Sequence, residues 1–379
     1  MKIIIYEIKK LFHWKVVTLV LLLSFFFYQF FMEFEFTHFP NGRPTTDHFL
    51  IAKDMIADYG NEMDETEFKD FKLTYQKEIE KADDYLKSRE DSVALGIKTY
   101  EQFQARDWDD EGVSELSSRI LFEEGVDIFW ELQAREGIIE RYEQREEDFY
   151  RVTGHIHDKV WKQKMAEEKN YNSILPISVV ENYNNLIKMV AIWVVVSVMI
   201  ITGRVFIVDQ KNSVLLIQYT SETGRRIFQK KVIASVISTL LITTVYLVAF
   251  FSMYRTNKTA EFFQSRVWSY DNFFYLSWFN INFFQFIILT VIGIYILALV
   301  AGMLSTILSR YMSNYITLIG SQVPIVILLV YFIGEYLIFN LSSIHDPKFL
   351  PFIIYTILIA FAFFWLTYRM RREKNLDIL

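Results

Sequence analysis

The residue types that carry enzyme chemistry are sparse in this sequence, and their spacing does not favour catalysis. The 379-residue chain has no Cys, so it can form neither a disulfide nor a thiolate metal site. No Gly is followed by Lys, no two Gly are separated by one residue, and no His is followed by Glu. These absences exclude a phosphate-binding loop, a dinucleotide fingerprint and the usual zinc-protease helix. We therefore predict no catalytic residue and no cofactor held by this chain.

One cluster has the residue types of a metal site, namely His155, His157 and Asp158. Residues two apart share a face on a strand but not on a helix. The surrounding sequence is typical of the start of a helix, so we expect an exposed polar turn here and no metal.

Four polar side chains lie in or beside long uncharged stretches of the chain. An ionisable residue at membrane depth is a functional candidate, but Lys188 and Glu335 are expected near the outer interface, where they would be solvated or paired. Gln285 and Gln322 could line a translocation path or bond between helices. No carboxylate is expected near the middle of a span, so the sequence argues against proton-coupled transport and places the energy source outside this chain.

The elements that must position these residues are hydrophobic helices. Hydrophobic residues make up 52% of the chain and aromatic residues 17%, and the charges are crowded between uncharged runs. A membrane-spanning helix needs about 20 apolar residues. The sequence therefore predicts an all-α membrane protein with six spans, over residues 15–36, 185–208, 232–254, 281–308, 313–339 and 349–368.

The basic residues next to these spans predict the orientation. They gather before the first span, in 209–231, at Arg310 and in the tail 369–379. With six spans these sites all fall on one side, which the positive-inside rule assigns to the cytoplasm. We expect a multi-pass protein of the cell membrane with both termini cytoplasmic.

Residues 37–182 are then extracytoplasmic and strongly acidic. They carry 19 Lys and Arg against 34 Asp and Glu, a balance of −15, whereas the remainder has 20 against 11, a balance of +9. An acidic surface keeps an exposed domain soluble and could favour a cationic ligand. It disfavours nucleic acid, which binds basic patches.

The acidic segment is predicted to be helical and large enough to bury a core of its own. Asp64 with Glu67 forms a capping-box pattern, and apolar residues follow it at spacings of three or four. Further helices are expected over 127–151 and 156–169. The loop 255–280 is rich in aromatic residues, which we interpret as an interfacial belt, with gating of an amphiphilic substrate as the alternative.

Two segments are expected on the cytoplasmic side. Residues 1–14 alternate Ile and Leu with charged residues and predict an amphipathic helix in the interface. Residues 209–231 have a polar centre, one Gly and a basic end. They could form an ordinary basic loop, or two short helices that present a surface to the cytoplasm.

In these features the chain resembles the permease subunits of ABC-2 type transporters. The resemblance rests on the amphipathic start Lys2–Lys10, the insertion after the first span, the segment Tyr219–Arg226 before the third span, the small-residue run Ala298–Ser305 and the basic tail. It covers nearly the whole membrane body but not the 146 residues of 37–182, an insertion that many members lack. Members with large insertions are often exporters or self-protection systems of Gram-positive bacteria that act on peptides and antibiotics.

The resemblance implies a permease that works with a separate ATPase subunit, which binds Mg-ATP, and with a second permease of the same or a sister chain in the lipid bilayer. It also implies that 209–231 holds the element that couples to the ATPase. Its contact residues would be Gln218, Tyr219, Thr220, Ser221, Glu222, Thr223, Gly224, Arg225, Arg226 and Phe228. The rival hypothesis is a receptor-like or scaffolding membrane protein whose outer domain binds a ligand or partner.

Overall fold

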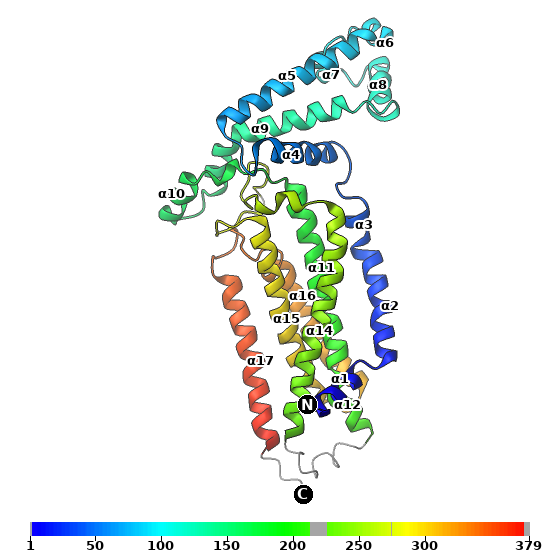
Figure 1. Cartoon of the computed structure of the whole chain (residues 1–379), viewed down its shortest axis with the longest axis vertical. Helices are drawn as coiled ribbons and strands as arrows, with labels where there is room; N and C mark the ends of the chain where they lie inside the picture. Colours follow the sequence, from blue (N-terminus) through cyan, green and yellow to red (C-terminus); the bar gives the residue numbers. More distant parts are fainter. Residues whose placement is uncertain (1, 213–225, 274, 375–379) are drawn as a thin grey trace. The chain divides into compact units, whose positions relative to one another are not determined.

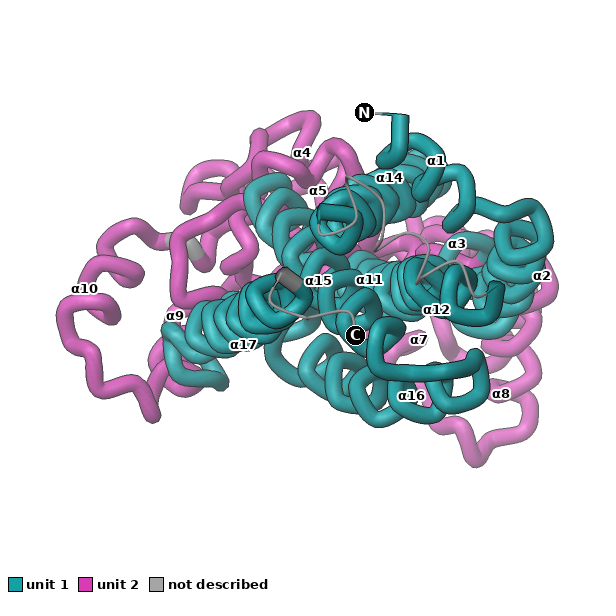
Figure 2. Tube along the Cα trace, turned by 90° about the horizontal axis from the view of Figure 1, so that it is seen from below, with its two compact units in different colours: residues 1–37, 181–258, 284–379 teal, residues 38–180, 259–283 magenta. Residues whose placement is uncertain are grey.

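The computed structural model describes residues 2–212, 226–273 and 275–374, and most of these residues are helical. Within those ranges the extended structure consists of isolated bridges, with no strand. The described chain divides into two compact units (Figure 2). We call Met1–Thr37, Glu181–Lys258 and Phe284–Leu379 the bundle unit, and His38–Val180 with Thr259–Phe283 the second unit.

The bundle unit contains the hydrophobic helices (Figure 1). Six helices among the described residues are long and apolar enough to cross a membrane, which confirms the number predicted from the sequence. Their segments are Trp14–Phe31, Ile177–Lys211, Ile227–Asn257, Phe283–Tyr311, Tyr315–Leu337 and Leu350–Glu373. The corresponding helices are α2 (Trp14–Phe31), α11 (Ile177–Thr202) with α12 (Arg204–Lys211), α14 (Ile227–Tyr254), α15 (Phe283–Tyr311), α16 (Tyr315–Phe332) and α17 (Leu350–Lys374). The shorter elements of the unit are α1 (Lys2–Leu11), α3 (Glu33–Thr37), the 3₁₀ turn η4 (Arg255–Asn257) and the π-helix η6 (Ile333–Leu337).

The second of these segments is interrupted at Gly203, which separates α11 from α12. A Cβ atom on Gly203 would lie 2.7 Å from Nε2 of Gln322 and 2.9 Å from Cδ2 of Leu318. A side chain at position 203 would therefore force Gln322 and Leu318 of α16 to shift. The joint sets the direction of α12, which carries one of the site residues described below.

The second unit is built from shorter helices. Helix α5 begins with the predicted capping box, in which the Asp64 side chain accepts from backbone N–H groups and Glu67 accepts from the N–H of Asp64. Its buried face packs on α9, and α4 also packs on α9. The elements are α4 (Thr45–Tyr59), α5 (Glu65–Ser88), α6 (Glu90–Ala94), α7 (Tyr100–Gln104), α8 (Glu111–Ser118), the π-helix η1 (Arg119–Glu123), α9 (Ile128–Val152), α10 (Lys159–Glu167), and the 3₁₀ turns η2 (Asn170–Asn172) and η5 (Ala260–Gln264).

The aromatic segment at 259–283 belongs to the core of the second unit, which corrects its interpretation as an interfacial belt. Trp268 and Tyr270 are each 1% exposed. The ring of Trp268 lies 5.5 Å from Phe149, and that of Tyr270 lies 5.5 Å from Tyr142, both on α9. These ring pairs join residues more than a hundred positions apart, so local composition could not distinguish a packed core from a belt.

Candidate functional site: a buried ion-pair cluster on α1, α12 and α14

Helix α1 places a carboxylate on the face that packs against the bundle. Ile4, Glu7, Ile8 and Leu11 recur at spacings of three and four, which puts them on one side of the helix. This side packs on α14 and α12, so Glu7 is 3% exposed and Leu11 is fully buried. The exposed residues of α1 include Ile5 and Tyr6. Glu7, one of the charged residues of the predicted amphipathic helix, therefore lies on the side of α1 that is buried against the bundle.

Glu7 contributes to a cluster of four charged side chains, which we call the α1 cluster: Glu7, Lys10, Asp209 and Lys231. Lys231 of α14 is 0% exposed. Its Nζ pairs with Oδ2 of Asp209 and lies 3.2 Å from Oε2 of Glu7. Lys10 Nζ lies 2.9 Å from Oδ2 of Asp209 and 2.5 Å from Oε2 of Glu7. Each ammonium thus contacts both carboxylates.

The α1 cluster is electrically balanced, with two ammonium groups facing two carboxylates. Burying an unpaired charge is costly, and burial becomes tolerable when ion pairs and further hydrogen bonds satisfy the group. Lys231 Nζ also donates a hydrogen bond to the carbonyl oxygen of Val205 at 3.1 Å. The same ammonium lies 5.3 Å from the centroid of the Phe206 ring, a cation–π contact. Burial by itself lowers the pKa of Lys10, but its hydrogen bond to Glu7 and the nearby carboxylate charges outweigh burial and raise that pKa above its ordinary value.

The cluster brackets the predicted coupling element along the chain. Asp209 stands on α12 just before that element, and Lys231 stands on α14 just after it. Of the predicted contact residues, 218–225 lie outside the described residues. Arg226 is exposed at the N-terminus of α14. Phe228 is 1% exposed and stacks on Phe206, with ring centroids 5.1 Å apart. The side chain of Phe228 therefore packs inside the bundle, where it cannot reach a partner.

A second set of buried ion pairs adjoins the α1 cluster through α12. Glu373 Oε1 on α17 lies 2.9 Å from Nε of Arg310 and 2.5 Å from Nη2 of Arg369. Gln210, the neighbour of Asp209, donates to the carbonyl oxygen of Arg310 at 3.2 Å. Two successive residues of α12 thus reach α1 and α14 on one side and α15 on the other.

The four polar residues predicted in or near the spans do not come together. Gln322 is buried and donates to the carbonyl oxygen of Met199 at 3.1 Å and to Ser305 Oγ at 2.8 Å, so it bonds between helices. Gln285 is exposed, as is Glu335. The Nζ of Lys188 lies 4.7 Å from the ring centroid of Phe339.

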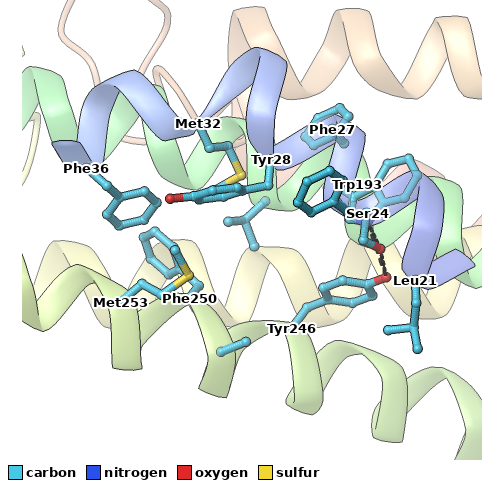
Figure 3. Close-up of a pocket in the computed structure, with 13 residues that line it drawn as sticks. Leu21, Ser24, Phe27, Tyr28, Met32, Phe36, Trp193, Tyr246, Phe250 and Met253 are labelled. Atoms are coloured by element: carbon cyan, nitrogen blue, oxygen red, sulfur yellow. Dashed lines mark hydrogen bonds between the residues drawn. The ribbon is translucent and has the colours of Figure 1, made fainter. Parts of the chain in front are cut away.

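A cavity of about 330 Å³ lies between α2, α11 and α14 (Figure 3). Its walls are aromatic, aliphatic and Met side chains. Three polar side chains meet at one end, where Ser24 Oγ is 2.8 Å from both the Tyr246 hydroxyl and Nε1 of Trp193. Since these three polar groups form hydrogen bonds with one another, the surface that remains for a ligand in the cavity is apolar.

Two groups of His and Asp residues have structural roles in the second unit. Asp158 accepts a hydrogen bond from the N–H of Trp161 and caps α10, while His155 and His157 are exposed. His48 and Asp271 are buried together, with Nε2 of His48 3.7 Å from Oδ2 of Asp271. Asp271 also pairs with Arg141 and accepts from the N–H of Ile177 at 2.9 Å. Burial lowers the pKa of His48, against the attraction of Asp271.

Sequence reasoning missed Glu7 and Asp209, although one signal for Glu7 was present. A lone carboxylate at helical spacing among Ile and Leu residues either is exposed at a cost to packing or meets a buried cation. The partner, Lys231, lies 224 positions away, and its basic neighbours made it look like an ordinary residue of an inner loop. Comparison of the chain with protein-family models, with curated proteins and with solved structures gives no match.

Proposed function

We propose that the chain is the permease subunit of an ABC-2 type exporter. It would move a peptide, an antibiotic or another amphiphile across the cytoplasmic membrane, using ATP hydrolysed by a separate subunit. A second permease, identical or a sister chain, would complete the pathway.

The α1 cluster is the observation that carries this proposal. A permease without an ATPase of its own must convert movement of a docked partner into movement of its spans. The α1 cluster ties the helices on both sides of the proposed coupling element, α12 and α14, to α1. Removing one partner of a buried ion pair typically costs about 3–5 kcal/mol, so these three helices would move together.

Helix α12 would extend that movement to the remainder of the bundle. Asp209 belongs to the α1 cluster, and Gln210 holds the end of α15 through the carbonyl oxygen of Arg310. In the proposed cycle, ATP draws two ATPase subunits together, the coupling element follows them, and α12 tilts α14 and α15 relative to each other. A substrate held between two permeases would then be released outward.

The cavity between α2, α11 and α14 supports an amphiphilic substrate. Ligand sites between helices typically measure about 300–1,000 Å³ and are mainly apolar with a few polar groups. The volume of about 330 Å³ is in this range, and the polar groups at Ser24 and Tyr246 occupy one end. Such a site would accept an apolar tail.

Reversing two charges in the coupling element tests the proposal. The tagged chain is purified in detergent from its native host, so that an ATP-binding subunit bound to it copurifies. Charge reversal at a docked pair costs several kcal/mol, so Arg225→Glu with Arg226→Glu should lower the copurified ATPase at least tenfold. Arg371→Glu with Arg372→Glu is the matched control, because both arginines are exposed and adjacent on α17.

The control pair should leave the complex intact. If the 225/226 variant retains the ATPase subunit and its full ATP hydrolysis, the coupling role of 218–226 is wrong. The scaffold hypothesis would then be the better one.

A further inference from the structure

A second groove lies on another face of α14, between α14 and α15. One face of α14 and η4 lines it from Thr244 to Arg255, opposite Val291 and Tyr295 of α15, and its volume is about 490 Å³. Apart from its two ends, the lining is mainly aliphatic and aromatic. Both helices belong to the membrane-spanning set, so a lipid chain is the natural neighbour of this surface.

The groove has the length of one lipid leaflet. Thr244 and Arg255 are eleven residues apart, which is roughly 16 Å along a helix. Tyr295 is twelve residues from the start of α15, or roughly 18 Å. The hydrocarbon core of a bilayer is about 30 Å thick. The groove therefore runs from the end of the two spans to about the middle of the membrane.

The two ends of the groove differ in chemistry. At the deep end the hydroxyls of Thr244 and Tyr295 lie 2.8 Å apart, and Thr244 also donates to the carbonyl oxygen of Leu240. These groups need no ligand. At the shallow end the Arg255 side chain is exposed, and its guanidinium has no acidic partner in 2–212, 226–273 or 275–374. A guanidinium binds phosphate through two parallel hydrogen bonds.

We propose that this groove binds one anionic phospholipid, with the phosphate at Arg255 and an acyl chain lying along α14 toward Thr244. The apolar length, the satisfied deep end and the unpaired cation at headgroup depth together favour this ligand over a zwitterionic lipid. The inference does not depend on the ATPase partner, so it stands or fails separately from the proposed function.

The absence of Cys allows a direct measurement in the full chain. Ser252 is exposed beside Arg255 on the rim of the groove, so Ser252→Cys can carry a fluorophore. The protein is placed in nanodiscs of phosphatidylcholine containing a small fraction of nitroxide-labelled phosphatidylglycerol or nitroxide-labelled phosphatidylcholine. One basic side chain near a lipid surface contributes about 1 kcal/mol. We therefore expect about fivefold stronger quenching by labelled phosphatidylglycerol than by labelled phosphatidylcholine at equal content.

Matched variants identify the group responsible. Arg255→Gln should remove the preference and Arg255→Lys should keep part of it. Lys258→Gln should keep it in full, because Lys258 is exposed nearby but does not line the groove. A fluorophore at Val245→Cys, an exposed position of α14 outside the groove lining, should respond equally to both lipids.

Two results would overturn the proposal: equal quenching by both lipids at position 252, or an unchanged preference in Arg255→Gln. Salt provides a further check on the labelled protein that keeps Arg255. Because exposed charges are screened within about 3 Å at 1 M ionic strength, the preference should fall steeply as salt is raised, and a preference insensitive to salt would also contradict the assignment.

Discussion

At the scale of single residues, the environment of Lys231 separates it from its neighbour Lys230. Lys231 is fully buried between Glu7 and Asp209, whereas Lys230 is only partly buried. The two residues look equivalent in the sequence, as adjacent basic residues ahead of a span. Only one of them is available to lipid or to a partner, and the other holds α1 to α14.

The variant Lys231→Met tests that role. It keeps the bulk of the side chain but leaves two buried carboxylates with Lys10 alone, so we expect destabilisation of about 3–5 kcal/mol. The thermal midpoint of the detergent-solubilised chain should fall, and α1 should become accessible to protease. Lys230→Met should change stability by about 0.5 kcal/mol or less.

A compensating change makes the same test specific for charge. Adding Asp209→Asn to Lys231→Met restores the balance between Lys10 and Glu7, so the double variant should be more stable than Lys231→Met alone. If the double variant is instead the less stable of the two, packing rather than charge balance sets the stability of this region.

At the scale of elements, the joint between α11 and α12 depends on one close contact. Gln322 of α16 bonds to Met199 and Ser305 directly beside Gly203, and a Cβ at 203 would displace its amide. We predict that Gly203→Ala destabilises the bundle by about 1–3 kcal/mol, the usual cost of overpacking. The measurement is the thermal midpoint of the purified chain.

Gly320 is the matched control for that variant. It lies inside α16, and a Cβ there would meet nothing within 4 Å. Because Ala favours a helix over Gly by up to about 1 kcal/mol, Gly320→Ala should be neutral or stabilising. Equal losses in the two variants would show that the close contact at Gly203 is unimportant.

The elements also show what local sequence could predict. The start of α5 is encoded by Asp64 and Glu67 three residues apart, and the hydrophobic spans follow from composition alone. The interruption at Gly203 and the residues that cover the inward face of α1 could not be predicted, since both are decided by residues from distant parts of the chain. Sequence periodicity reveals that a face is buried but not which residues cover it.

At the scale of the whole molecule, the unequal distribution of charge predicts the topology. Basic residues border the hydrophobic segments, and acidic residues crowd into 37–182. Single-Cys variants in the Cys-free chain test this at exposed positions. An impermeant maleimide added to intact cells should label Thr66→Cys of α5, whereas Ser313→Cys, between α15 and α16, should react only after permeabilisation. Labelling of both in intact cells would contradict the six-span arrangement with inner termini.

The division of the chain into units has a consequence for its biosynthesis. Residues 181–258, which belong to the bundle unit, separate the two pieces of the second unit. At about 5–20 residues per second, a ribosome needs roughly 5–20 s to pass from residue 180 to 283. During that interval Tyr142 and Phe149 lack the rings of Tyr270 and Trp268. The nascent second unit therefore waits, with an incomplete core, for the insertion of two spans, and a fragment ending at residue 182 would remain in that unfinished state.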